Sequence, residues 1–230
     1  MLILLPGLIC DASLYASQLA AFPQAKAVDG YGKADTLEEM AQQVLDEAPE
    51  RFDLFGHSMG GRVALEVFRA APERVRRIAL VSTGMHPVQP TEPAKRQVLL
   101  DIGREKGIEA VVDAWLPPMV APERVADEEL MGPLRAMSIR AGLDVFKAQI
   151  HALLNRGEHE SLLGQIKCPA LVMTGSKDSW SGPAQHEGIA AAIPTSELVI
   201  VEGAGHMIMA ESPQAVNAAI ANWLERPAGD

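Results

Sequence analysis

With 230 residues, of which 48% are hydrophobic and 22% charged, the chain is long enough for one globular domain with an inserted segment. Its net charge of −10 argues against a general affinity for nucleic acid or for anionic membranes. The cysteines, Cys10 and Cys168, form no disulfide framework, so we expect a cytoplasmic protein, and no ligand set for a metal stands out. Residues 1–10 are apolar but lack a basic start and contain Pro6-Gly7, which favours an opening strand over a targeting or membrane segment.

Strand-like and helix-like patterns alternate along the first part of the chain and again along the last. The expected strands are 2–5, 27–28, 52–55, 77–82, 170–174 and 198–201. The expected helices are 14–21, 36–48, 60–71, 184–192 and 213–224. Such alternation is typical of an α/β fold, with a mostly parallel sheet covered by helices on both faces.

The middle of the chain has a different pattern. Residues 86–165 contain no convincing strand and have helical character, with breaks at prolines. We therefore expect a core formed by residues 1–85 and 166–230, interrupted by a helical insertion at 86–165. The larger apolar residues of the insertion are Trp115, Met119, Met131, Met137 and Phe146. They fit either the packing of a helical layer or a lid over an apolar substrate pocket, and the low aromatic content of 4% favours a largely aliphatic pocket.

The most informative motif is the G-x-S-x-G pentapeptide at residues 56–60, centred on Ser58. A strand pattern precedes it and a helix pattern follows, so Ser58 is expected on a sharp turn with its hydroxyl exposed. The glycines two positions to either side allow a tight backbone and close neighbours. The helix N-terminus directs backbone N–H groups towards negative charge that develops beside the serine. The motif therefore predicts a serine nucleophile.

A serine nucleophile needs a base, and the base needs an acid that orients it. In a parallel sheet such groups are expected where strands end. His206 follows the strand 198–201 in a glycine-containing loop, and Asp178 follows the strand 170–174, so these two residues are the predicted base and acid. Glu202 is the main alternative to Asp178. The other histidines are expected to have structural, solvated or lid roles: His57, His86, His151, His159 and His186.

Hydrolysis also needs N–H donors for the oxyanion. The backbone N–H of Met59 is expected to supply one, because it begins the helix after Ser58. Leu8 follows the first strand, and its N–H is the candidate for the second. A plain turn between strand and helix is the alternative interpretation of this loop.

These motifs resemble those of the α/β-hydrolase superfamily in its serine carboxylesterase-like branch, and the resemblance extends over essentially the whole chain. It rests on residues 5–8 as oxyanion loop, 56–61 as elbow, 175–178 as acid loop and 203–206 as base loop, in the order Ser58, Asp178, His206. Many members carry His-Gly where this chain has Pro6-Gly7. The resemblance implies a parallel sheet of about six strands, without the antiparallel edge strands of the full family, and a helical cap at 86–165.

The combined expectation is a hydrolase that cleaves carboxylic esters of small molecules through an acyl-enzyme intermediate, with no cofactor and no metal. The first alternative is a carbon–carbon bond hydrolase or enol-lactonase of aromatic catabolism. The second is a non-catalytic ligand receptor on a hydrolase scaffold, since a complete triad does not exclude one. The expected partner is a small-molecule ester or lactone, and acyl and alcohol specificity and oligomeric state stay open.

Overall fold

The computed structural model describes residues 1–228 and contains one parallel sheet in that range. Six strands of the described chain lie in the order β2-β1-β3-β4-β5-β6, and every neighbouring pair is parallel. Their bounds are β1 Leu2–Leu5, β2 Lys26–Ala27, β3 Phe52–His57, β4 Val75–Val81, β5 Ala170–Gly175 and β6 Ser196–Val201. The α/β fold and the six-stranded sheet expected from the sequence are thereby confirmed.

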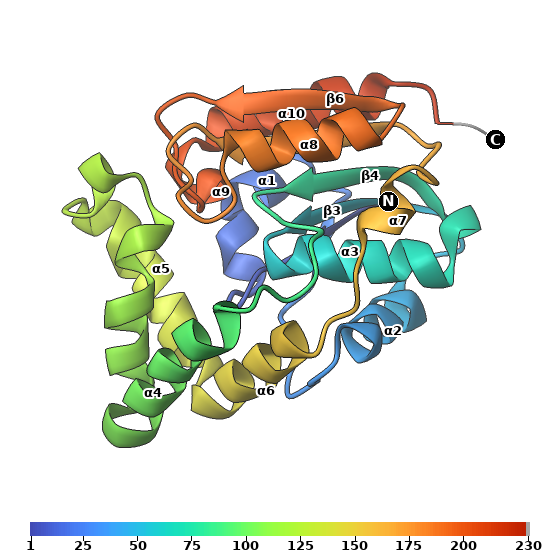
Figure 1. Cartoon of the computed structure of the whole chain (residues 1–230). Coiled ribbons are helices and arrows are strands. Elements are labelled where there is room, and N and C mark those ends of the chain that lie inside the picture. Colours follow the sequence, from blue (N-terminus) through green and yellow to red (C-terminus); the bar gives the residue numbers. More distant parts are fainter. Residues whose placement is uncertain (229–230) are drawn as a thin grey trace.

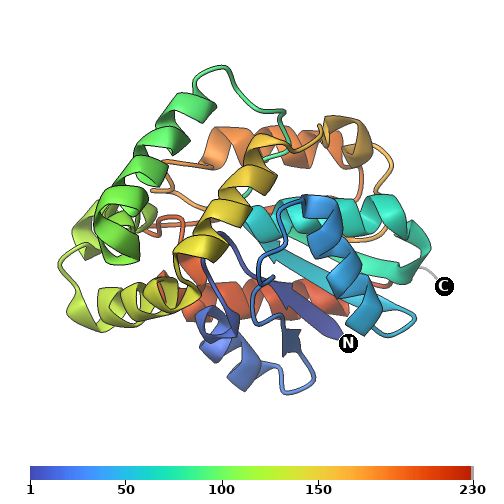
Figure 2. The same ribbon diagram turned by 90° about the horizontal axis from the view of Figure 1, so that it is seen from below.

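Helices cover both faces of the sheet (Figure 1, Figure 2). Helices α1 (Ala16–Ala21) and α10 (Pro213–Glu225) pack together on one face. Helices α2 (Leu37–Glu47), α3 (Met59–Ala70) and α8 (Pro183–Ala192) lie on the other. Residues 2–5 and 52–57 are buried throughout, as expected of strands enclosed by helices on both sides.

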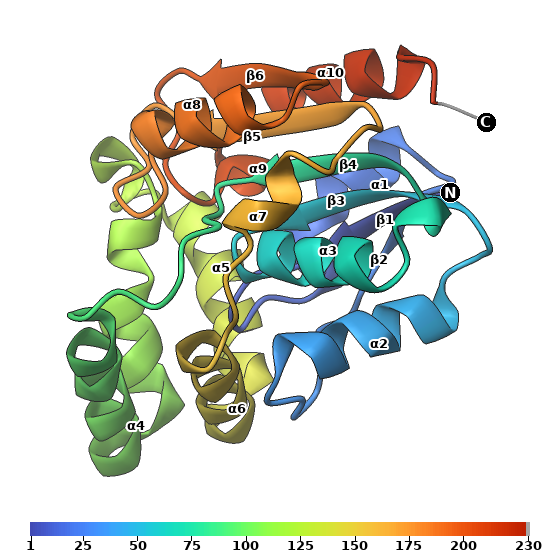
Figure 3. The same ribbon diagram turned by 45° about the vertical axis from the view of Figure 1, so that its right-hand side comes forward.

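The segment between β4 and β5 is helical. It contains α4 (Glu92–Trp115), α5 (Glu128–Ala141), α6 (Leu143–Leu154) and the short α7 (Glu160–Leu163). Helices α4, α5 and α6 lie beyond the carboxyl ends of the strands, as the green and yellow ribbons in Figure 1 and Figure 3 show. In the following, "the helical layer" denotes α4, α5 and α6. It faces the end of the sheet at which the loops after β1, β3, β5 and β6 begin.

Local sequence sets several boundaries. The Thr36 side chain accepts a hydrogen bond of 3.1 Å from Glu39 N–H and caps α2, and Asp127 caps α5 in the same way. The expected helix 14–21 is split into a 3₁₀ turn at Ala12–Tyr15 and α1. Strands β4 and β6 begin earlier than expected because their first residues include charged side chains, which hide the apolar pattern. Within residues 1–228, no helix is both long and apolar enough to cross a bilayer.

Candidate active site

Ser58 occupies a strained turn between β3 and α3, with φ 56° and ψ −118°. A non-glycine residue in this region stores strain and is held there by its surroundings. A Cβ at Gly56 would clash with the Gly60 carbonyl, and one at Gly60 would clash with the backbone of Leu5. Both glycines of the pentapeptide are thus required by close backbone approach, as expected from the motif.

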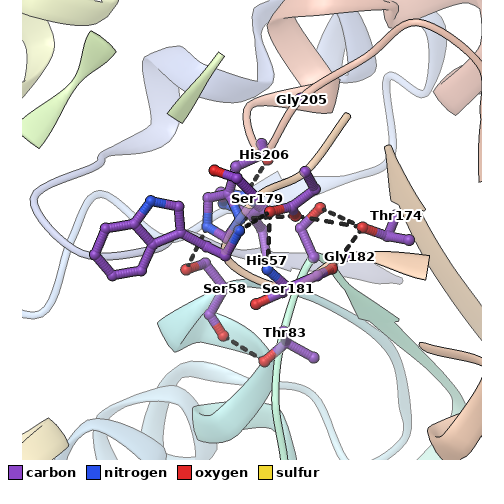
Figure 4. Close-up of polar contacts among 12 residues, drawn as sticks. His57, Ser58, Thr83, Thr174, Ser179, Ser181, Gly182, Gly205 and His206 are labelled. Carbon is purple, nitrogen blue, oxygen red and sulfur yellow. Dashed lines mark hydrogen bonds and ion pairs between the residues drawn. The ribbon is translucent and has the colours of Figure 1, made fainter. Parts of the chain in front are cut away.

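Hydrogen bonds from β4 hold the backbone of this turn. Ser58 N–H donates to the carbonyl oxygen of Val81 over 2.9 Å. The Thr83 hydroxyl donates to the carbonyl oxygen of Ser58 over 2.6 Å, as drawn in Figure 4. Thr83 N–H in turn donates to Nε2 of His186 over 3.1 Å. Strand β4 and the residues that follow it therefore stabilise the strained backbone conformation of Ser58.

The structure brings Ser58, His206 and Asp178 together. Nε2 of His206 lies 2.9 Å from the Ser58 hydroxyl oxygen, and Nδ1 lies 2.9 Å from Oδ2 of Asp178. His206 follows β6 and Asp178 follows β5, at the two strand ends from which the sequence led us to expect them. Glu202, the alternative acid, is exposed at the turn after β6. The hydroxyl, the imidazole and the carboxylate thus form an unbroken chain of hydrogen-bond contacts.

The surroundings of Asp178 stabilise its charged form beside the imidazole of His206. Its Oδ1 accepts hydrogen bonds of 2.8 Å from the N–H groups of Trp180 and Ser181. Burial by itself would raise the pKa of Asp178, but the nearby His206 and these N–H donors hold that pKa well below its usual range. The carboxylate can therefore fix Nδ1–H of His206 and leave Nε2 as the acceptor that faces Ser58.

Two further contacts hold the loop that carries His206. Glu211 accepts hydrogen bonds from Gly205 N–H over 3.0 Å and from Ala121 N–H over 2.8 Å, both at Oε2. His206 N–H donates to the carbonyl oxygen of Met119 over 2.9 Å. The loop is thus attached to the segment 119–121 of the insertion. Nothing in the sequence pattern had singled out Glu211.

The Gly7–Leu8 turn lies against the nucleophile. A Cβ at Gly7 would lie 3.0 Å from Cβ of Ser58, and Leu8 lines the pocket in front of it. The next N–H, that of Ile9, donates to Gln149 of α6 over 2.7 Å. Neither Leu8 N–H nor Met59 N–H makes a hydrogen bond within residues 1–228. Both predicted oxyanion donors are therefore beside Ser58 and unoccupied by protein acceptors.

A pocket of about 300 Å³ opens in front of Ser58 and His206. Trp115 and Met119 line it, but Met131, Met137 and Phe146 do not, so these three belong to the packing of the helical layer. The wall is mainly apolar, as expected, but two of its apolar residues, Trp115 and Trp180, are aromatic, and charged side chains also line it. The charged residues that line the pocket are Arg62, Glu92, Lys95, Arg96 and Arg156.

The remaining histidines differ in surroundings. His86 lines the pocket and His151 is exposed. His159 is buried 2.7 Å from a carboxylate oxygen of Glu66, and His186 is buried behind Thr83. A solvated or lid role for these last two is thus incorrect; both hold the core together. No group of three or more His, Cys, Asp or Glu side chains in the described part of the chain is arranged to hold a metal ion.

Comparison with known proteins agrees with this geometry. The family model described as "Alpha/beta hydrolase family" matches residues 3–219. A dihydrolipoyllysine-residue acetyltransferase component of an acetoin cleaving system from Pseudomonas putida is 28% identical over 228 residues, covering 96% of this chain but only 58% of the relative. The chain thus spans little more than half of that relative's length.

Two further similarities concern hydrolases. A 2-hydroxy-6-oxononadienedioate/2-hydroxy-6-oxononatrienedioate hydrolase from Cupriavidus pinatubonensis is 27% identical over 213 residues, covering 85% of this chain and 73% of the relative. The malate-bound structure of a thermophilic esterase from Thermogutta terrifontis is 25% identical, with a TM-score of 0.89, and the match covers 98% of this chain and 89% of that one. With the family model matching nearly its full length, the chain belongs to the alpha/beta hydrolase family.

Proposed function

We propose that this protein is a serine hydrolase that cleaves carboxylic esters of small molecules through an acyl-enzyme intermediate. The observation that carries the proposal is the path from Ser58 through His206 to Asp178, with both separations at 2.9 Å. The similarity to a thermophilic esterase supports the ester substrate. Cys10 and Cys168 are free thiols, which fits our expectation of a reducing, cytoplasmic location.

In the first half of the reaction, His206 takes the proton of Ser58 while the serine oxygen attacks the ester carbonyl. Asp178 stabilises the imidazolium that results. The free N–H groups of Leu8 and Met59 are the donors to the oxyanion, which is where such donors contribute most. His206 then gives its proton to the leaving alcohol, and the acyl group stays on Ser58.

In the second half, water replaces the alcohol. His206 takes a proton from water as the water attacks the acyl carbonyl, and the tetrahedral intermediate collapses to release the acid. The proton returns to Ser58. The same base therefore acts in both steps.

A second candidate is hydrolysis of a carbon–carbon bond or an enol-lactone, with the same three residues. It is favoured by the similarity to the hydrolase from Cupriavidus pinatubonensis that acts on 2-hydroxy-6-oxononadienedioate. Product analysis with a vinylogous diketone and an enol-lactone, compared with simple alkyl esters, separates the two reactions.

The test of the main proposal is Ser58→Ala with short-chain alkyl esters, followed by titration of released acid. We expect turnover to fall by about a thousandfold or more, because the covalent step is removed. Ser179→Ala is the matched control, since Ser179 is an exposed serine near the pocket whose hydroxyl faces the carbonyl oxygen of Pro118 over 3.3 Å. If Ser58→Ala retained most of the activity in a clean preparation, the mechanism would be wrong.

A further inference from the structure

One end of the pocket carries more positive than negative charge. The guanidinium groups of Arg62, Arg96 and Arg156 line it, together with a single carboxylate, that of Glu92. Arg62 and Arg156 are only 6% and 7% exposed. Arginine is rarely buried to this extent without a counter-ion, so the balance of charge at this end needs an explanation.

Glu92 is fully engaged by two of the three guanidinium groups. Its Oε1 accepts from Nη1 of Arg156 over 2.9 Å and from Nη2 of Arg96 over 2.7 Å, and its Oε2 accepts from Nη2 of Arg156 over 2.7 Å. Burial alone would raise the pKa of Glu92, but these two arginines lower it to about 2. The carboxylate is therefore charged and already shared.

Arg62 has no carboxylate partner. The only hydrogen bond of its side chain within residues 1–228 runs from Nη1 to the carbonyl oxygen of His86 over 3.1 Å. No carboxylate of the described chain is within ion-pair distance of its guanidinium group. Arg156 approaches the same carbonyl with Nε at 3.4 Å, so two cations converge on one neutral acceptor. Burial, and next the charge of Arg156, lower the pKa of Arg62 to about 9. A bound anion would supply the missing counter-charge and offset the repulsion between the two arginines.

Polar groups beside Arg62 face the same pocket, because Gly84, His86 and Gln185 line it together with Arg62 and Ser58. A Cβ at Gly84 would lie 2.5 Å from Nε2 of Gln185, 2.9 Å from Nη2 of Arg62 and 3.2 Å from Nε2 of His86. Three nitrogens thus pack closely against Gly84, and a side chain at this position would displace them from the pocket wall. Nδ1 of His86 faces the carbonyl oxygen of Pro87 over 3.0 Å. Nε2 of Gln185 donates one hydrogen to the carbonyl oxygen of Thr83 over 2.9 Å and keeps a second, so the donors for a ligand are Arg62 and Gln185.

The spacing along α3 relates the guanidinium group of Arg62 to the reacting atoms. Ser58 precedes α3 and Arg62 lies four residues further on, which corresponds to about 6 Å along a helix axis. Side chains on a helix lean towards its N-terminus, so the Arg62 side chain extends back over the turn that begins at Ser58. A group bound by Arg62 is therefore a few carbon atoms away from a carbonyl held at Ser58.

We propose that the substrate carries a carboxylate a few carbons from its scissile carbonyl, and that Arg62 binds this carboxylate with help from Gln185. This inference rests on the proposed esterase function and specifies its substrate class. Arg96 and Arg156, fixed by Glu92, add the positive potential that favours the anionic ester over a neutral one.

The test compares esters that differ only in a carboxylate. Monoethyl glutarate is paired with ethyl valerate, which places the carboxylate on the acyl side, and 4-acetoxybutanoate is paired with butyl acetate, which places it on the alcohol side. We expect kcat/KM of the wild-type protein to favour the anionic member of one pair by about tenfold to a hundredfold. In Arg62→Gln this ratio should fall to near one.

Two further variants keep the test decisive. Arg104→Gln removes an exposed arginine of α4 that pairs with Asp101, and it should leave the ratio unchanged. Arg62→Lys keeps the charge but loses the planar fork, so it should retain part of the ratio. The inference is overturned if the wild-type protein hydrolyses the esters without preferring the anionic member of either pair, or if Arg62→Gln retains the preference.

A binding measurement separates this inference from the proposed function. Glutarate, but not glutaramide, should raise the melting temperature of Ser58→Ala, and the additional change Arg62→Gln should abolish that rise. If all esters are inert while glutarate still binds through Arg62, the esterase proposal fails and the anion site stands. If neutral esters are hydrolysed through Ser58 and glutarate does not bind, the anion site fails and the esterase proposal stands.

Discussion

His57 Nε2 lies 2.9 Å from the carbonyl oxygen of His206, so the residue before Ser58 is hydrogen-bonded to the residue that we propose as the base. A carbonyl oxygen only accepts, so Nε2 of His57 carries the proton and Nδ1 does not. Nδ1 is buried and has no partner within residues 1–228. The side chain thus bridges the turn after β3 and the loop after β6 and fixes their separation.

Replacing His57 should therefore impair catalysis more than substrate binding. In His57→Phe the hydrogen bond to the His206 loop is lost, and we expect kcat to fall about tenfold to a hundredfold with little change in KM, because the base is misplaced. The free energy of unfolding should fall by about 1 kcal/mol. His151→Phe, at an exposed position of α6, is the control. An unchanged kcat in His57→Phe would show that this bridge has no catalytic importance.

Acid should destabilise the protein through two buried histidines. Burial lowers the pKa of His57 to about 3 and that of His186 to about 4. Below about pH 6.5 the unfolded chain binds protons at these rings and the folded chain does not, so stability falls as the pH falls, until the folded rings also titrate. Each ring contributes a slope of at most about 1.4 kcal/mol per pH unit.

Urea unfolding at pH 7, 6 and 5 measures this dependence. In His57→Phe the slope should decrease by about one histidine's share of roughly 1.4 kcal/mol per unit. A slope equal to that of the wild-type protein would contradict the assignment of His57 as a neutral buried group.

The role proposed for Asp178 can be tested with a substitution that keeps the shape of its side chain. Asp178→Asn keeps the volume but removes the charge that fixes Nδ1–H of His206, and we expect kcat to fall by about a thousandfold or more. Because Asn can still accept from Trp180 and Ser181 N–H, the melting temperature should change much less than kcat. A variant that loses folding and activity together would not support an orienting role.

Gly7 is a position where one methyl group should disturb the oxyanion donors. A Cβ there lies 3.0 Å from Cβ of Ser58 and 3.2 Å from Nδ1 of His57, so the turn must shift. In Gly7→Ala we expect kcat to fall by about tenfold to a hundredfold as Leu8 N–H moves away from the oxyanion. Gly132→Ala in α5 is the control, since nothing lies within 4 Å of its Cβ. Equal activities of the two variants would exclude a role for the Gly7–Leu8 turn.

Glu92 should matter for stability because it compensates two guanidinium groups. Arg156 is 1% and Arg96 16% exposed in the side chain, so Glu92→Gln leaves both partly or fully buried without their carboxylate. We expect the free energy of unfolding to fall by about 3 kcal/mol. Asp101→Asn breaks the exposed pair with Arg104 and should cost less than about 1 kcal/mol in the same denaturation experiment. Similar losses in the two variants would contradict this difference.

The groups that the structure brings together at Ser58 could be predicted because each is tied to local sequence. Ser58 lies in a motif whose glycines are needed by close backbone contact, and Asp178 and His206 each follow a strand with an apolar run, at residues 170–173 and 198–201. In a parallel sheet such positions converge at one edge whatever the details of packing. The positions that we propose for the acid and the base therefore follow from the order of elements alone.

The pocket wall could not be predicted in this way. Arg62 is on α3, Glu92 and Arg96 are on α4, and Arg156 follows α6, so their proximity depends on how the helical layer packs against the core. The sequence does not show whether an arginine is buried or exposed to solvent, because no periodic pattern distinguishes the two cases. The burial of His159 and His186 was missed for the same reason, because their partners Glu66 and Thr83 are distant in sequence.

Glu92 has a consequence for how this chain can evolve. Its carboxylate joins the first turn of α4 to the segment after α6, and it also sets the charge at one end of the pocket. Exchanging Glu92 for a neutral residue leaves Arg96 and Arg156 without their carboxylate partner and should destabilise the fold. Removing one of the arginines mainly changes the charge of the pocket. A lineage that drifts towards uncharged substrates would have to change several of these positions together, so substrate choice and the fold of the helical layer are inherited as one unit.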